Sequence, residues 1–145
     1  MGAKLRGLSL LLFGGAALAC GSDGVGPSPD EIAGTWTATK MEYVSVSQPV
    51  QTVDLIDEGG TATLALNANG TYTFTVTPNG EPQTVDTGDW ELDGDIMTVL
   101  PDGTTFQLQF DVALAGNTLT LTGADAEFDF GSGDEDAKLN LELVR

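Results

Sequence analysis

The side chains that most often carry out chemistry in proteins are scarce in this sequence. Its 145 residues include no histidine and one cysteine, Cys20, against 22 acidic residues. A serine or cysteine triad needs a histidine or a comparable base, and zinc-type metals prefer histidine and cysteine ligands. Carboxylate pairs could hydrolyse glycosides, but no segment marks a sugar-binding cleft. We therefore expect a protein that is not an enzyme and that uses no cofactor.

The densest acidic run extends from Asp125 to Asp136. A strand would place Asp125, Glu127 and Asp129 on one face, because strand side chains alternate between the two faces. The run does not fit an EF-hand loop, whose sixth position needs glycine and is Phe130 here. A looser calcium site at the three carboxylates remains an alternative to a solvated strand edge, which we favour.

Cys20 follows a segment with the pattern of an export signal. Lys4 and Arg6 precede a short apolar stretch, residues 8–18, and the residues just before the cysteine are small. The apolar stretch is too short to cross a bilayer, which takes about 20 residues as a helix. An unpaired cysteine in an exported protein needs an explanation, and its place directly after such a segment offers one.

Residues 17–20, Ala-Leu-Ala-Cys, resemble the lipobox of bacterial lipoproteins. The resemblance implies that a signal peptide, residues 1–19, is removed and that acyl chains anchor Cys20 in a membrane. Gly21 stands where an Asp tends to retain Gram-negative lipoproteins at the inner membrane, so the expected location is the outer membrane of a bacterial cell envelope. Ala17 replaces the usual Leu, and secretion with a free thiol is the alternative.

Loss of the signal segment leaves three of the five basic residues against all 22 acidic ones, a formal net charge of −19. Such a surface repels nucleic acid and anionic lipid headgroups. We therefore expect no nucleic-acid partner, a monomer, and membrane contact through the lipid anchor alone. The sequence defines no protein partner, and the dispersed acids favour a solubilising coat over a cation-binding surface.

A stretch rich in Gly, Pro and Ser, residues 20–31, predicts a flexible tether that spans on the order of 20 Å. One folded domain, residues 32–145, follows. Its apolar residues alternate with threonine and other polar residues, which indicates strands with one buried face, and no helical period is sustained. Strands are expected near residues 34–46, 60–67, 71–78, 83–92, 95–100, 104–114, 117–122 and 137–144, with short additional candidates near 51–56 and 125–130.

Hairpin geometry sets the register of these strands, because residues that face each other must share a face of the sheet. The pairs are Leu66–Tyr72 and Leu64–Phe74 in one hairpin, and Leu114–Leu119 and Val112–Leu121 in another. The first leaves a three-residue loop ending in Gly70, and the second leaves the turn Gly116-Asn117, both of favoured types. The result is an antiparallel meander of about eight strands, which tends to close into a β-barrel.

The register of residues 95–101 is less determined. Two-residue turns at 93–94 and 102–103 would place Met97 and Val99 inside the barrel. Three-residue loops would instead place Ile96, Thr98 and Leu100 inside. We favour the second arrangement, because Pro101 with its fixed φ suits the first position of a longer loop.

Four short motifs appear in an order similar to that of the lipocalin-like domains of bacterial lipoproteins, within the calycin group. They are Gly34-Thr35-Trp36 and the segments 66–72, 87–92 and 117–122. The resemblance covers about residues 32–145 and implies an up-and-down barrel of eight strands with a small apolar cavity. It implies no particular ligand.

The barrel interior is the candidate binding site for a small apolar ligand. Small barrels either fill with side chains or hold one such ligand. A cell-envelope binding lipoprotein and a filled structural or protein-interaction module are therefore the two functional hypotheses. The candidate ligand-facing residues are Trp36, Tyr72, Phe74, Trp90, Phe106, Leu108, Phe110, Leu121 and Leu141.

Two basic residues could contribute to the same interior. By resemblance to lipocalins, Arg145 at the end of the last strand is expected over the ring of Trp36 in the first strand, where a cation–π contact contributes about 0.5–2 kcal/mol. A frayed Arg145 in solvent is the alternative. Lys40 shares the Trp36 face only if the first strand has no bulge, and could then meet an anionic head group. We favour a bulge that turns Lys40 outward.

Overall fold

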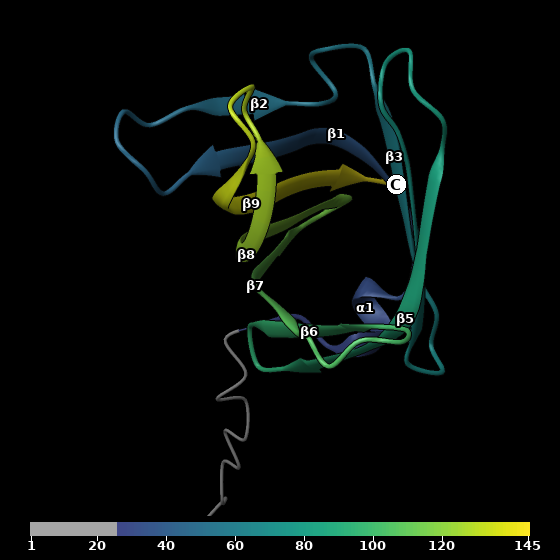
Figure 1. Ribbon diagram of the computed structural model, residues 1–145. Coiled ribbons are helices and arrows are strands. Elements are labelled where there is room, and N and C mark those ends of the chain that lie inside the picture. Colours follow the sequence, from purple (N-terminus) through teal and green to yellow (C-terminus); the bar gives the residue numbers. More distant parts are fainter. Residues whose placement is uncertain (1–25) are drawn as a thin grey trace, which may run out of the picture.

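The computed structural model describes residues 26–145, which form one short helix and nine strands. The elements are α1 (Pro29–Ile32), β1 (Gly34–Ser45), β2 (Thr52–Asp54), β3 (Thr61–Leu66), β4 (Thr71–Thr77), β5 (Thr84–Asp93), β6 (Ile96–Pro101), β7 (Leu108–Ala115), β8 (Thr118–Asp129) and β9 (Asp134–Val144). Sequential strands pair antiparallel, and β9 pairs back with β1. Eight strands, β1 and β3 to β9, therefore close a barrel, and β2 adds to the far half of β1 (Figure 1).

The closed antiparallel barrel confirms the predicted all-β fold, and the two predicted hairpins have the expected register. Leu66 lies opposite Tyr72, and Leu64 lies opposite Phe74. The second hairpin pairs Leu114 with Leu119 and Val112 with Leu121. Facing apolar residues and glycine-containing turns were therefore sufficient to fix these two registers.

Of the two arrangements considered for residues 95–101, the favoured one is wrong, and Met97 and Val99 lie inside as in the other. β5 and β6 are joined by the two-residue turn Gly94-Asp95, with Gly94 at φ +63°, a conformation that glycine adopts without steric cost. Met97 and Val99 consequently face inward and are buried. The residues predicted inside, Ile96, Thr98 and Leu100, face the other way. The tight turn follows the twist of its strands, and it pairs Val99 with the inward Trp90.

Two bulges adjust the barrel wall. In β1 the register shifts between Ala38 and Lys40, and in β8 it shifts between Leu121 and Ala124. The second bulge contains Gly123, whose N–H donates to the side chain of Asn140 at 2.9 Å. β8 therefore continues as one strand through residues that the sequence divided into two segments, 117–122 and 125–130.

The barrel has two different ends. The loops at 67–70, 94–95 and 116–117 lie at the end where β1 begins, together with α1, and this is called the closed end. The loops at 46–51, 55–60, 78–83, 102–107 and 130–133 lie at the opposite end, called the open end. Figure 1 shows the strands as a ring with α1 seen inside it.

Residues 26–31, predicted as part of a flexible tether, belong to the folded domain. Pro29 begins α1, and the Glu31 carboxylate accepts a hydrogen bond from the Ser28 N–H at 2.7 Å, as in a capping box. Ile32 is fully buried. Gly26 approaches the Gly94 backbone so closely that a Cβ would lie 2.0 Å from its carbonyl oxygen. The rest of the predicted tether, residues 20–25, and the predicted signal peptide lie outside the described residues.

Candidate functional site

The barrel interior contains an apolar pocket. Its cavity volume is about 50 Å³. Because one water needs roughly 10–15 Å³ by that measure, the pocket has room for a few waters or the end of an alkyl chain. The lining residues are Leu64, Tyr72, Phe74, Asp86, Met97, Val99, Leu108, Phe110, Leu121, Leu139 and Leu141.

One side of the pocket is polar. The Tyr72 hydroxyl donates a hydrogen bond of 2.7 Å to Oδ2 of Asp86. Burial of the ring, and then the hydrogen bond to Asp86, raise the pKa of Tyr72, so the phenol keeps its proton. Opposite Tyr72 on β5 is Gly88, where a Cβ would lie 2.8 Å from the tyrosine ring. The absence of a side chain at Gly88 leaves the space that the ring occupies.

Buried side chains fill the closed end of the barrel below the pocket, and Ile32, Trp36 and Leu143 among them are called the plug. Trp36 and Ile32 are fully buried, and the indole N–H of Trp36 donates to the Ile32 carbonyl at 2.8 Å. The Arg145 guanidinium lies 4.3 Å from the centroid of the Trp36 ring. It also donates to the carbonyls of Glu31 at 2.8 Å and Ala33 at 3.1 Å. The contact that the sequence placed between Trp36 and Arg145 is therefore present, and it ties the end of β9 to α1.

An aromatic wall continues the inward faces of β1 and β8 toward the open end. Tyr43 and Phe128 stack with ring centroids 4.3 Å apart, and Phe130 meets Phe128 edge-on at 4.9 Å. Burial raises the pKa of Tyr43. A wider hollow of about 620 Å³ lies between Phe128 and the loops at 55–60 and 78–83, and it also contains acidic side chains, among them Glu81. This hollow therefore combines an aromatic side chain with acidic ones.

The closed barrel, its plugged end and its interior pocket can be compared with known families. A sequence profile described as a lipocalin-like domain matches residues 32–129, more than half of the chain. The chain belongs to the lipocalin-like domain family. The family resemblance predicted from the sequence is thereby confirmed. No curated protein matches the chain.

The lipocalin-like pocket contains six of the nine predicted ligand-facing residues: Tyr72, Phe74, Leu108, Phe110, Leu121 and Leu141. Trp36 and Trp90 are buried in the core but do not line it, and the Trp90 indole instead donates to the Asn67 carbonyl at the closed end. The placement of Phe106 inside the barrel is wrong. Phe106 is 55% exposed, because β7 begins only at Leu108 and the preceding residues form an open-end loop.

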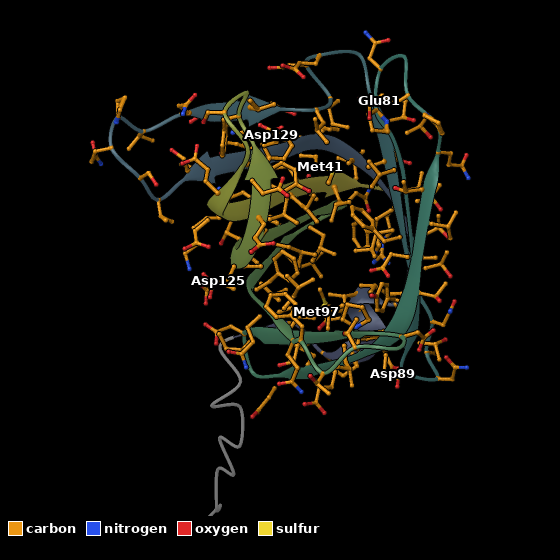
Figure 2. All side chains as sticks on the ribbon, viewed as in Figure 1. Met41, Glu81, Asp89, Met97, Asp125 and Asp129 are labelled. Atoms are coloured by element: carbon orange, nitrogen blue, oxygen red, sulfur yellow. The ribbon has the colours of Figure 1, made fainter. Side chains whose placement is uncertain are left out.

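Five lining residues are not among the nine predicted ligand-facing residues: Leu64, Asp86, Met97, Val99 and Leu139. Leu64 was expected to face Phe74 across its hairpin. Met97 and Val99 were assigned to the outer face with the wrong turn, and Leu139 lies on the predicted inward face of the last strand but was omitted. Asp86 is charged, and hydrophobic alternation cannot mark a charged interior residue. The available signal was its spacing along the strand. Asp86 is two residues before Gly88 and four before the inward Trp90, so it lies on the same face of β5, opposite Phe74. Figure 2 labels Met97 inside the lipocalin-like barrel and Asp89 outside it.

The remaining candidates lie on the outer surface of the lipocalin-like barrel. The bulge in β1 turns Lys40 outward, as favoured from the sequence, and its ammonium lies 3.1 Å from the Glu42 carboxylate. Lys40 therefore does not line the pocket.

Within residues 26–145 no helix is long and apolar enough to cross a membrane.

The predicted alternative of a calcium site gains no support from the positions of its three carboxylates. Asp125 pairs with Lys138. Asp129 accepts hydrogen bonds from the N–H groups of Gly131 and Gly133 in the β8–β9 turn, which lower its pKa. Over the described part of the chain, no group of three or more potential ligands converges on a metal position.

Proposed function

We propose that this protein is an exported, lipid-anchored binding protein whose lipocalin-like barrel takes a small apolar ligand. The observation that carries the proposal is the interior pocket, which is lined almost wholly by apolar side chains and lies above the Trp36 plug. Apolar lining with few polar groups is typical of small-molecule sites. Binding rather than catalysis is also favoured by a chain that contains no histidine.

The size of the pocket restricts the ligand. With a cavity volume of about 50 Å³, it suits a short alkyl chain rather than a bulky ring system. Phe74 and Leu108 are only partly buried, so the wall near the open end has more freedom to adjust than the fully packed closed end. We therefore propose an unbranched alkyl group as the part that enters the barrel.

Calorimetric titration with 1-octanol tests the binding, because this probe is apolar and uncharged. The expected result is saturable binding that is lost in Val99→Phe, which fills the pocket, and retained in Phe106→Ala, which alters an exposed side chain. Leu108→Phe, at a partly buried position, is a second filling variant that should fold more readily. Thermal unfolding of each variant verifies the fold. No saturable binding to the folded wild-type protein would contradict the proposal.

The small volume also favours a second candidate, a structural or protein-interaction module with a filled barrel. The side chains around the plug are fully buried, among them Trp36, Leu119 and Leu143. Such a module would show no heat with 1-octanol, and Val99→Phe would then change its stability without changing any binding. The same titration thus separates the two candidates.

The anchor and the location are part of the proposal. The Ala-Leu-Ala-Cys segment supports lipidation of Cys20 in a bacterial envelope, at the outer membrane. Without residues 1–19 the formal charge of the chain is −19, so electrostatic attraction to anionic lipid is absent and the acyl chains should account for membrane retention. Cys20→Ser should release the protein into the soluble fraction, whereas the neighbouring Ser22→Ala should not. A Cys20→Ser protein that stays with the membrane would disprove the anchor.

A further inference from the structure

Asp86 is the one charged side chain among the residues that line the pocket. It lies opposite Phe74 in the β4–β5 pairing, so the backbone register itself directs it to the inner face. The carboxylate is partly in solvent, since Asp86 is an exposed residue at the side of the pocket. A ligand whose tail is in the pocket would therefore have its polar head within reach of this carboxylate.

The neighbours of Asp86 hold it in place. Tyr72 is 3% exposed, and its ring fills the space left by Gly88. Its hydroxyl donates to Oδ2 of Asp86, and because the phenol keeps its proton it acts as a donor toward the carboxylate. The negative charge is thus fixed at the edge of an apolar surface by a residue that cannot easily move.

No basic side chain of the described residues neutralises this carboxylate. Lys40 pairs with Glu42 on the outer face of β1. Lys138 pairs with Asp125 on the outer face of the β8–β9 hairpin. Arg145 lies at the closed end over Trp36. A ligand with a carboxylate head would therefore meet a like charge, whereas an ammonium head would find an available counter-ion.

We propose that the pocket selects an alkyl chain with a positively charged ammonium head over the corresponding fatty acid. This inference rests on the proposed function, because it assigns the head group of the same ligand. A charge pair that is partly exposed to solvent contributes little to the binding free energy. Because octylammonium is attracted to the carboxylate and octanoate is repelled by it, their binding free energies differ by roughly twice the contribution of one pair. The expected preference of octylammonium over octanoate is therefore about tenfold in Kd at low salt, and salt should reduce it.

Titration of the protein with octylammonium, 1-octanol and octanoate tests the inference, since the three share one tail. The expected affinity falls in that order. Asp86→Asn should reduce the ratio between the Kd values of octanoate and octylammonium. Asp89→Asn is the matched control, because Asp89 lies on the outer face of the same strand (Figure 2) and the substitution changes the net charge equally. This variant should keep the preference.

Tyr72→Phe provides a second variant. It keeps the apolar ring and removes only the hydroxyl that positions Asp86, so the preference for octylammonium over octanoate should decrease. Equal binding of octanoate and octylammonium, or equal effects of Asp86→Asn and Asp89→Asn, would overturn the inference and leave the proposed function intact. Failure of all three compounds to bind the folded protein would overturn the proposed function, and the inference with it.

Discussion

The two ends of the barrel differ in how completely their side chains are packed. At the closed end, Ile32, Trp36 and Leu143 are fully buried, and the guanidinium of Arg145 joins β9 to α1. At the open end, exposed apolar residues are found in the loops, including Phe106. Apolar and polar residues alternate in the same way along the strands between the two ends. The difference in packing therefore arises from the elements that cover each end: α1 and Arg145 at the closed end, and longer loops at the open end.

This difference separates stability from recognition. A fully packed end supplies the burial that stabilises the fold, at about 1.5–3 kcal/mol for each large apolar side chain. An end with half-buried walls and loops opens locally at lower cost, and it is where binding residues are usually found. We therefore expect substitutions at the closed end to lower stability and substitutions at the open end to alter binding.

The same truncation at the two ends should give the largest contrast. Leu143→Ala, in the plug, should lower the free energy of unfolding by about 2–5 kcal/mol, because it leaves a cavity in a fully buried site. Leu108→Ala, at a partly buried position, should cost about 1 kcal/mol. Urea unfolding measures both values. Equal losses would show that the two ends are packed alike.

The contact of Arg145 with Trp36 should contribute less. Arg145→Ala removes a cation–π contact and two hydrogen bonds from a solvent-accessible side chain, so we expect a loss of about 1 kcal/mol. Both the melting temperature and the tryptophan fluorescence should change. Arg145→Lys is the control, because it keeps the charge but cannot reach both carbonyls, and it should give an intermediate loss. Unchanged values in Arg145→Ala would contradict the role of this contact.

The cap of α1 should make the closed end sensitive to acid. The Ser28 N–H lowers the pKa of Glu31 from its ordinary value of 4.5. A carboxyl group with a lowered pKa in the folded state stabilises that state above its unfolded pKa, and the effect is lost as pH falls through the folded pKa. Wild type should therefore have a higher melting temperature than Glu31→Gln near neutral pH, and the difference should disappear as pH falls through the lowered pKa of Glu31. A difference that persists in acid would contradict this cap.

The smallest effect is expected at the open end. Phe106 is 55% exposed, so Phe106→Ala should change the free energy of unfolding by less than about 0.5 kcal/mol. Phe110→Ala is the matched comparison two strand positions away from the loop, where the side chain is 4% exposed, and it should cost about 3 kcal/mol. Chemical denaturation of the pair gives the test. A large loss for Phe106→Ala would mean that the open end is packed after all.

The sequence was most informative where facing residues constrain one another. The Leu64–Phe74 and Leu114–Leu119 pairs were predictable because apolar residues on two strands must share a face on either side of a glycine turn. The turn before Met97 was not, because both loop lengths placed apolar residues inside. Phe106 was misplaced because alternation continued into a loop, where no neighbouring strand fixes the direction of a side chain.

Other features were encoded in patterns that were given too little weight or carry no hydrophobic signal. Ser28-Pro29-Asp30-Glu31 is a helix start, with proline at its first position and an acid at its third, although the glycine around it favoured a tether. Asp86 faces the interior because of strand register alone. The bulge in β1 was favoured from the sequence, whereas the bulge in β8, between Leu121 and Ala124, was not predicted.

The close approach of Gly26 to Gly94 has a consequence for the orientation of the molecule. The chain joins the barrel at the closed end, and Cys20 is six positions earlier, at most about 20 Å away when fully extended. With acyl chains on Cys20, as proposed, the closed end would face the bilayer and the open end would point outward into the aqueous compartment. The protein would then exchange its ligand with that compartment or with a second carrier there, rather than extract it from the leaflet beneath.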